Sequence, residues 1–492
     1  MEPFLPIHPT DTVAVALEAL AAGTALSCGI TLTEEIPAGH KFALKPHLIG
    51  APVVKYGYPI GTAKTEILPG QWVHTHNVRS ALEGLLEYSY TPEWRDLPEQ
   101  KALTFRGYRR PNGKVGIRNE VWIIPTVGCV NAIARQIEIE SQQFLTPELD
   151  GIFSYSHPYG CSQLGGDQLL TQKALCGLIQ HPNAAAVLVL GLGCENNTMD
   201  EMKAMLGPVD PNRVKFLVCQ ESEDEIEDAL VLMEQLCSYA RQFHREECPA
   251  SELTVGLKCG GSDGFSGITA NPLVGAFSDR LLAQGGSTIL TEVPEMFGSE
   301  QILMNRCRNN ELFEQTVSLI NDFKSYFLRY GEKVDENPSP GNKKGGITTL
   351  EDKSLGCTQK AGSAPVSGVL QYGDPVTVHG LNLLQSPGND LVASCALAFS
   401  GAQIILFTTG RGTPFGCPVP TVKVASNTPL ATRKKNWIDF DAGRLLSEEV
   451  PMDTLADEFF RQILAIASGE CHAKSEALDK RDLAIFKDGV TL

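Results

Sequence analysis

The sequence predicts an α/β protein in which a small N-terminal β domain precedes a two-part α/β region with mostly parallel sheets. Three observations predict this class. Short strand candidates separated by Pro/Gly turns fill the first 90 residues or so. Strands and helices then alternate over residues 120–245, and a second alternating region begins near residue 250. A chain of 492 residues is long enough for two to four such domains.

The boundaries follow from changes in composition. We expect a β domain at 1–95, a linker arm at 96–119, a second α/β domain at 120–248 and a C-terminal α/β catalytic domain at 249–492. The arm belongs to a stretch rich in Pro, Arg and Gly, Tyr90–Asn119. A hinge is therefore expected between about residues 85 and 110.

The β domain carries two histidines of interest. One helix is expected at Asp11–Ala22. The strand candidates are Ala25–Leu32, Val53–Tyr56 and Gln71–Asn77. In a strand, His74 and His76 fall on one face, because side chains alternate. Two imidazoles on one face can chelate a metal or transfer protons, or they are simply solvent-facing residues of an edge strand.

Residues 120–245 place chemistry-bearing side chains along one edge of a predicted parallel sheet. The expected strands are Val121–Thr126, Gly151–Tyr155, Ala184–Leu190 and Val214–Cys219. Ligands of such sheets bind beyond the carboxyl ends of the strands. That rule gathers Cys129, His157, Cys161, Cys194 and Glu195 at one edge. The Gly clusters there fit neither a dinucleotide fingerprint nor a Walker loop.

In the C-terminal region, strand candidates again end in Gly, Ser/Thr, Asn or charged residues. Arg411, between two glycines, suits a carboxylate clamp, because its planar fork matches a carboxylate; the alternative is an ordinary surface arginine. Asn337–Gly362 is long, specific in composition and rich in Gly, Asn and Lys. We interpret it as a binding loop rather than a polar surface loop.

Charge and composition exclude several classes of protein. The net charge is −17 and no basic block occurs, which argues against nucleic acid. No apolar run approaches a membrane span, and the first Lys or Arg is Lys41, so a signal-peptide n-region is not expected. We expect a cytoplasmic homo-oligomer that acts on a small molecule, with no nucleic-acid or membrane partner. An anionic substrate would need a locally positive pocket.

The 14 cysteines contain no CxxC pair, which argues against zinc-ribbon and thioredoxin-like sites. Several lie in glycine turns instead of apolar segments, where they are better placed for chemistry or metal binding. Cys129, Cys161, Cys194, Cys357 and Cys417 each follow a glycine, and Cys259 precedes Gly260-Gly261.

Long motifs give the chain a resemblance to a known family. They are IPAGHKFAL, HTHN, RRPNGKVGIRNE, TVGCVN, SHPYGCSQLG, GLGCENN, CGGSDGFSGITANP, TEVPEMFG, the segment ENPSPGNKKGGITTLEDKSLGCTQKAG, SPGND, TGRGTP and WIDFDAG. The chain resembles the altronate/galactarate dehydratases over nearly its whole length. The resemblance implies an N-terminal β-clip domain of the SAF type. It also implies iron(II)-dependent dehydration of a sugar acid, such as D-altronate to 2-dehydro-3-deoxy-D-gluconate in hexuronate (galacturonate) catabolism.

The residues suit such chemistry, which needs a base, an acid and a cation or Lewis acid for the enediolate. The candidate metal ligands are Cys161, Cys194, Cys259 and Cys357, with His74 and His76 as further candidates. Fe²⁺ is expected, Mn²⁺ is a possible substitute, and an iron–sulfur cluster is not excluded. The acid/base candidates are His157 and then Lys360. The candidate substrate-binding residues are Arg411, Lys343, Asn271, Asn342, Asn389 and Gln359.

The segment Asn337–Gly362 should bring Lys343, Gln359 and Lys360 to the strand ends that carry Cys161 and Cys194. Two other functions stay open. One is a lyase for another substrate, such as galactarate or a sulfonated hydroxy acid. The other is a sugar-acid binding protein without turnover.

Overall fold

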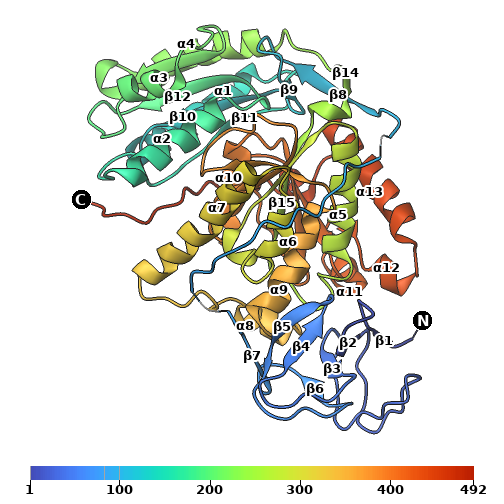
Figure 1. Ribbon diagram of the computed structural model, residues 1–492. Coiled ribbons are helices and arrows are strands. Elements are labelled where there is room, and N and C mark those ends of the chain that lie inside the picture. The colour runs from blue at the N-terminus through green and yellow to red at the C-terminus, as the bar shows by residue number, and fades with distance from the viewer. Residues whose placement is uncertain (1, 83, 99) are drawn as a thin grey trace.

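The computed structural model describes residues 2–82, 84–98 and 100–492. Its N-terminal β domain and its second domain lie at opposite ends of the C-terminal domain (Figure 1). This arrangement confirms the predicted class, a small β domain followed by two α/β units with parallel sheets. No helix in the described part of the chain is both long enough and apolar enough to cross a membrane.

The N-terminal domain consists of two small antiparallel sheets. The first has the order β1-β2-β3-β6 and the second β4-β5-β7. Their strands are β1 Phe4–Leu5, β2 Val13–Ala16, β3 Lys41–Ala43, β4 Pro52–Lys55, β5 Tyr58–Ala63, β6 Trp72–Val73 and β7 Val78–Arg79. Of the other predicted strands here, Ala25–Leu32 keeps only an isolated bridge, Ala25 to Thr31.

The helix predicted at Asp11–Ala22 is wrong. Val13–Ala16 is a fully buried strand between β1 and β3. Val13 packs into one hydrophobic cluster, whereas Ala14 and Ala16 pack into another. Alanine favours helices in isolation, but this segment has apolar partners on both faces, which a strand satisfies by alternation.

The second domain has a four-stranded parallel sheet in the order β11-β10-β12-β13. Val121 and Ile123 of β10 pack with α1 and α4, whereas Trp122 and Ile124 pack with α2 and α3. The predicted alternation of strands and helices is confirmed here. The elements are β10 Glu120–Pro125, α1 Asn131–Ser141, β11 Gly151–Ser154, α2 Gly166–Ile179, β12 Ala184–Gly191, α3 Met199–Leu206, β13 Val214–Val218 and α4 Glu225–Ala240.

The C-terminal domain is built on a seven-stranded parallel sheet in the order β17-β18-β16-β15-β19-β20-β21. The strands are β15 Thr254–Cys259, β16 Ser287–Leu290, β17 Val366–Leu370, β18 Gly380–Leu384, β19 Ile404–Thr409, β20 Thr421–Ala425 and β21 Phe440–Asp441. The helices outside residues 337–362 are α5 Ala270–Ala283, α6 Glu300–Asn305, α7 Asn310–Arg329, α10 Asp390–Phe399, α11 Thr428–Arg433, α12 Arg444–Ser447, α13 Met452–Ala467 and α14 Lys474–Ala477.

Helices cover both faces of this sheet. Apolar residues of α5, α7 and α13 share one hydrophobic cluster with strands β15, β16 and β20. On the other face, α10 packs with α2 of the second domain in a cluster that includes residues of both sheets. The second and C-terminal domains are therefore joined by a continuous apolar core.

The predicted linker arm is extended, and it is attached to the rest of the protein by a small sheet and by side-chain hydrogen bonds of the segment before it. Strands β8 Thr104–Arg109 and β9 Val115–Gly116 form a small antiparallel sheet with β14 Glu246–Pro249. The preceding segment runs along the outside of the C-terminal domain (Figure 1). There the Tyr88 hydroxyl donates to Glu300 over 2.6 Å, and the Tyr90 hydroxyl donates to the Cys307 carbonyl over 2.6 Å.

We predict that Asp352→Ala lowers the free energy of unfolding by about 3–5 kcal/mol, because it leaves two buried ammonium groups unpaired. Asp352 is buried and accepts from Lys41 over 2.8 Å and from Lys55 over 2.9 Å. Urea denaturation measures the change. The control is Asp374→Ala, which breaks a half-exposed pair with Lys173 and should cost less than about 1 kcal/mol. Equal effects of the two substitutions would contradict the prediction.

Candidate active site

The segment interpreted from sequence as a binding loop is helical. It contains α8 Pro340–Lys344, α9 Leu350–Cys357 and a 3₁₀ turn, η6, at Thr358–Ala361. Ser339 caps α8 in a capping box with Asn342, and the Thr349 side chain accepts from the Asp352 amide at the start of α9. These caps explain the helices, because each satisfies free amide groups of a first turn.

The same segment lies between the N-terminal domain and the carboxyl edge of the C-terminal sheet. On one side, Lys41 and Lys55 reach Asp352, and the Thr349 hydroxyl donates to the Ile60 carbonyl. Although burial alone would raise it, the charges of Lys41 and Lys55 hold the pKa of Asp352 well below its usual range. On the other side, α9 and η6 bring Cys357 and Lys360 to the strand ends.

A buried group of sulfur, carboxylate and ammonium lies where β15 ends. The Sγ atoms of Cys259 and Cys357 are 3.4 Å apart. Cys259 Sγ lies 2.9 Å from a carboxylate oxygen of Glu295 and 3.0 Å from the Lys360 ammonium. All four side chains are buried. Residues from three separate parts of the sequence therefore meet at one strand end.

Further charges surround this group. Lys353 pairs with Glu295 over 2.7 Å. Lys258 contacts Glu292 and also pairs with Asp390 over 2.9 Å. The side chain of Asp390 is 46% exposed, whereas Lys258 is fully buried, so this pair connects the buried group to the surface. Three lysines thus face three carboxyl groups, so the group is balanced in charge when all three carboxyl groups are ionised and both thiols are protonated.

The two glutamates are driven towards different protonation states. Burial and the nearby charge of Glu295 raise the pKa of Glu292, against the opposing effect of Lys258. The pKa of Glu295 is lowered, because Lys353 and Lys360 outweigh its burial. Unequal carboxylates of this kind commonly divide the acid and base roles of an active site. Lys360 is protonated, because the neighbouring sulfurs raise its pKa despite burial.

Glu292 also has an unusual backbone. Its φ of 68° lies in the left-handed region, which is costly for a residue with a Cβ. Glu292 lies two residues after the end of β16 at Leu290, and its carboxylate accepts from the Cys259 amide over 3.1 Å. Such strain is typical of functional sites, where the surrounding structure holds a side chain in place.

The group has the donors for one metal ion. In the described part of the chain, Cys259, Glu295 and Cys357 offer ligand atoms that all lie within 4.8 Å of one another. Two thiolates and a carboxylate suit iron(II) and leave positions for other ligands. A divalent cation that displaces two thiol protons would leave the charge of the group unchanged, so the residues fit the ion.

The predicted substrate-binding residues divide into two kinds. Arg411 lies at the same edge as α8, the helix that carries Lys343: Arg411 follows β19, and its guanidinium donates to the Gly341 carbonyl in α8 over 3.3 Å. The amide side chains instead hold the scaffold. Asn271 bonds to the Gly356 carbonyl and Thr408, Asn342 to the Ser262 carbonyl, Gln359 to the Gly267 carbonyl, and Asn389 caps α10. Their substrate contacts stay predictions.

The expectation of one cleft shared with Cys161 and Cys194 is wrong. Those cysteines lie in exposed loops of the second domain, whereas α8 and α9 lie beside the N-terminal domain at the other end of the molecule (Figure 1). The chain has two parallel sheets and therefore two carboxyl edges. The four predicted cysteine ligands are divided between them, Cys259 and Cys357 at one and Cys161 and Cys194 at the other.

His157 is held by the main chain on both ring nitrogens. Its Nε2 donates to the Pro125 carbonyl over 2.8 Å, and its Nδ1 accepts from the Tyr159 amide over 3.2 Å. Burial lowers the pKa of His157 to about 4, so the ring is neutral near pH 7. These contacts fix the loop after β11, and the acid/base role stays a prediction.

His74 and His76 follow β6 in a turn, not in a strand. Both rings nevertheless lie against Trp72, with ring centroids 5.5 Å and 5.3 Å away. His74 is buried and its Nδ1 lies 3.2 Å from the Thr348 hydroxyl, whereas His76 is exposed. His74 therefore belongs to the interface with the segment 337–362, and its role in metal binding or proton transfer stays a prediction.

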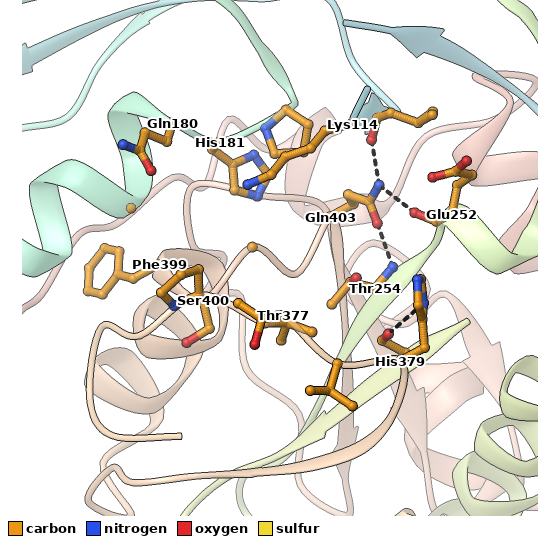
Figure 2. A pocket seen from close by; sticks show the side chains of 18 of the residues that line it. Lys114, Gln180, His181, Glu252, Thr254, Thr377, His379, Phe399, Ser400 and Gln403 are labelled. Carbon is orange, nitrogen blue, oxygen red and sulfur yellow. Dashed lines mark hydrogen bonds between the residues drawn. The ribbon is translucent and has the colours of Figure 1, made fainter. Parts of the chain in front are cut away.

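A pocket of about 170 Å³ lies elsewhere, between the second and C-terminal domains (Figure 2). It is lined by the first residues of β15 and β16, Thr254 and Ser287, and by Gln403 before β19. Gln403 donates to and accepts from main-chain groups there, which ties the strand starts together. Because this is the amino edge of the sheet, it is not where ligands of such folds bind.

Sequence reasoning missed Lys258, Glu292, Glu295 and Lys353. The signal for two of them was present, since Glu292 and Glu295 lie in the motif TEVPEMFG directly after a strand. Acidic residues are common at strand ends, and single positions do not stand out. Only the fold shows that they face Cys259, which is 33 and 36 residues away.

Three family profiles match this three-part architecture. "Altronate/galactarate dehydratase SAF domain" matches residues 2–81, "D-galactarate dehydratase/Altronate hydrolase, second domain" matches 107–241, and "D-galactarate/Altronate dehydratase, C-terminal" matches 250–491. The chain belongs to the altronate/galactarate dehydratase family, which confirms the resemblance seen in its motifs.

Within the family, the chain is similar to particular enzymes over its whole length. It is 53% identical to the altronate dehydratase of Escherichia coli (strain K12), over 99% of this chain and 100% of that protein. It is 52% identical to the altronate dehydratase of Bacillus subtilis (strain 168), over 100% of both. Identity to the galactarate dehydratase (L-threo-forming) of Escherichia coli is 33%, over 95% of this chain and 93% of that protein.

We predict that His74 makes the fold weaker in acid. Burial and the charge of Lys41 lower the pKa of His74 to about 3, so the unfolded chain binds a proton that the folded chain does not. Stability is lost as the pH falls below about 6.5, by about 2 kcal/mol between pH 7 and pH 5. Urea denaturation at both pH values should show a smaller loss for His74→Gln.

The control for this prediction is His472→Gln. The pKa of His472 is raised by its hydrogen bond to Glu476, so its contribution has the opposite sign and is lost as the pH rises. His472→Gln should therefore not reduce the loss in acid. An unchanged pH dependence in His74→Gln would show that the ring is not held neutral by the fold.

Proposed function

We propose that the protein is a hydro-lyase that dehydrates D-altronate to 2-dehydro-3-deoxy-D-gluconate. The observation that carries the proposal is the full-length likeness to two altronate dehydratases, at 53% and 52% identity. The 33% identity to the galactarate enzyme makes galactarate the second candidate substrate. The buried charged group at the C-terminal sheet supports an enzyme over a sugar-acid binding protein, since binding alone needs no such group.

The reaction removes water from a 2,3-dihydroxy acid. A base takes the proton on C2, the C2–H electron pair becomes the C2–C3 double bond, and the 3-hydroxyl leaves with a proton from an acid. The resulting enol then tautomerises to the 2-keto acid, and C3 takes its new proton from solvent. The carboxylate carries extra negative charge as the C2 proton leaves, so fixed positive charge speeds the step.

The residues at the carboxyl edge of the C-terminal sheet can supply the base, the acid and the positive charges that this reaction needs. Glu292 serves in its ionised form as the base at C2, because a carboxylate with a raised pKa accepts a proton more strongly. Lys360, held protonated beside Cys259, serves as the acid towards the 3-hydroxyl. Arg411 and Lys343 bind the substrate carboxylate at the mouth of the site, and Lys258 adds fixed positive charge.

Cys259, Cys357 and Glu295 would hold iron(II), with Mn²⁺ as a substitute. Bound there, the ion would supply Lewis acidity towards substrate oxygens. The sulfur ligands also explain an expected loss of activity in air, because thiolates oxidise readily. We place the enzyme in the cytoplasm as a homo-oligomer, in the breakdown of hexuronates.

We expect turnover of D-altronate to exceed that of galactarate and of a sulfonated hydroxy acid in a substrate panel assayed anaerobically with Fe²⁺. In heavy water, the 2-keto product should carry deuterium at C3, because the enol is reprotonated by solvent. Mass spectrometry and proton NMR of the products measure both results. Binding of D-altronate without any product would favour the sugar-acid binding protein, and a product without deuterium would exclude the solvent-exchanging enol.

Arg411→Ala should raise the KM for D-altronate by about 10–100-fold, the value of one charged hydrogen bond to a carboxylate. A fall in kcat as well would show that the clamp tightens on the enediolate. Steady-state kinetics measures both parameters. The matched control is Arg461→Ala in α13, an exposed arginine outside the site, which should leave KM unchanged. An unchanged KM in Arg411→Ala would remove the clamp from the proposal.

Chelation should abolish turnover, and Fe²⁺ with a thiol reductant should restore it. Glu295→Gln removes a ligand of the single ion. The variant should therefore contain about one iron less per chain than the wild-type protein, counted as iron that is not matched by acid-labile sulfide. Added Fe²⁺ should not restore its turnover. The matched control is Glu351→Gln, another buried glutamate, whose side chain contacts Ser80 and Ala81 instead of the group. A chelator-resistant enzyme would contradict the metal.

A further inference from the structure

Three exposed cysteines lie in the loops that follow three adjacent strands of the second sheet. Cys129 comes after β10, Cys161 after β11 and Cys194 after β12. The strands are parallel and neighbouring, in the order β11-β10-β12, so the three loops leave the same edge. Five of the 14 cysteines are exposed, and three of these five gather here. The function proposed above uses none of them.

Main-chain hydrogen bonds tie the three loops to one another. The Gly128 amide donates to the Tyr159 carbonyl over 2.8 Å, which joins the loops of Cys129 and Cys161. The Asn197 amide donates to the Gly160 carbonyl over 2.9 Å, which joins the loops of Cys161 and Cys194. Each bond lies within three residues of the cysteines, so the thiols are placed relative to one another by the backbone.

Polar side chains face two of the sulfurs. The Sγ of Cys161 lies 3.6 Å from the Asn196 side-chain oxygen and 3.8 Å from the Ser162 hydroxyl. The Gln220 amide donates to the Sγ of Cys194 over 3.5 Å. The Ser162 hydroxyl and the Gln220 amide donate to the sulfurs, and such bonds stabilise thiolates and cluster sulfurs, whereas the Asn196 oxygen accepts from the protonated Cys161 thiol.

Glu195 makes the loop of Cys194 rigid. Its buried carboxylate accepts from the Leu192 amide over 3.0 Å, the Gly193 amide over 2.6 Å and the Thr126 hydroxyl over 2.7 Å. Since Thr126 directly follows the neighbouring strand β10, one carboxylate fixes the start of two cysteine loops. The buried carboxylate of Glu195 makes hydrogen bonds that fix these loops, which indicates that their position is important for the function of this edge.

The loop of Cys161 is fixed from another direction. Residues 487–492 run along the second domain, and the Leu492 amide donates to the Ser162 carbonyl over 2.9 Å. Gln163 forms an isolated β-bridge with Thr491. The loop therefore rests on a strand-like contact in addition to its bonds with the other two cysteine loops.

The spacing of the sulfurs distinguishes between kinds of metal site. A single ion holds its thiolates about 4 Å apart, because each metal–sulfur bond is about 2.3 Å long. The three sulfurs are not among the described groups whose ligand atoms all lie within 4.8 Å. A cuboidal cluster holds its cysteines further apart, because each binds a different iron. Loops on adjacent strands, roughly 5 Å apart at the backbone, suit that wider spacing.

A fourth cysteine follows β13, but it does not join the site. Cys219 is partly buried and packs against the hydrophobic cluster between the sheet and helices α1 and α4. The structure therefore supplies three cysteines to the edge. Four and five residues after Cys161, Gly165 and Gly166 have no atoms within 4 Å of where a Cβ would stand, so this part of the loop faces open space.

We propose that Cys129, Cys161 and Cys194 hold a [4Fe–4S] cluster whose fourth iron has no cysteine ligand. The three thiols lose their protons as three iron–sulfur bonds form. The fourth iron faces solvent and binds water, hydroxide or an oxygen of a small hydroxy acid. This site is separate from Cys259 and Cys357, and it is tested without substrate, so its failure would leave the proposed dehydration untouched.

The test uses the full chain, purified without oxygen and incubated with Fe²⁺, sulfide and a thiol reductant. We expect about four acid-labile sulfides per chain, with broad visible absorption. One-electron oxidation by ferricyanide should then convert [4Fe–4S]²⁺ to [3Fe–4S]⁺, releasing one Fe²⁺ and passing one electron to form ferrocyanide. Electron paramagnetic resonance detects the three-iron product, which forms readily only when one iron lacks a cysteine.

Cys129→Ser, Cys161→Ser and Cys194→Ser should each lose nearly all of the sulfide. The controls are Cys28→Ser and Cys471→Ser, exposed but outside this edge, and Cys259→Ser at the other metal site; all three should keep it. Equal melting temperatures would show that the exposed substitutions leave the fold intact. A wild-type protein without sulfide after reconstitution would overturn the proposal, and so would retention of the cluster in all three variants at this edge.

Discussion

The buried ion triad of Asp352, Lys41 and Lys55 holds the candidate active site together. Asp352 lies in the first turn of α9, the helix that ends at Cys357, and both lysines come from the N-terminal domain. Burying three charges costs several kcal/mol per ion, and their attraction repays this only in the correct geometry. The triad therefore does more for the placement of α9 than for overall stability. If α9 shifts, Cys357 leaves Cys259 and the metal ligands separate.

Charge balance governs the next layer of the site. A lone buried carboxylate or ammonium would neutralise itself by a large pKa shift. Here each is compensated, Lys353 by Glu295 and Lys258 by Glu292 and Asp390. The site can therefore keep ionised groups in a dry interior, where their fields are stronger than in water. An acidic protein thereby obtains locally positive groups for an anionic substrate without changing its overall charge.

The fold was predictable to the extent that local pattern determines it. Alternating strands and helices gave both parallel sheets, whereas the alanine-rich strand β2 was mistaken for a helix because burial on two faces is not visible locally. Capping signals at Ser339 and Thr349 could have shown that the predicted loop is helical.

The site was harder to predict because it depends on long-range contacts. The strand-end rule found Cys259 and Arg411, but it could not tell which of two sheet edges each cysteine belongs to. Cys259 and Cys357 are 98 residues apart, and nothing local connects them. The shifted pKa values of Glu292 and Glu295 depend on burial and on neighbouring charged side chains, which only the fold brings together.

The route of the chain between the N-terminal domain and the rest has a consequence for how the protein can be divided. Residues 84–98 and 100–103 pass along the outside of the C-terminal domain, while the contacts that join the two domains lie at a separate buried surface. Covalent continuity is thus not what aligns the two domains. A gene split within this segment would encode two polypeptides that carry matching surfaces, and their affinity in trans would report the strength of the domain interface directly, free of the tether.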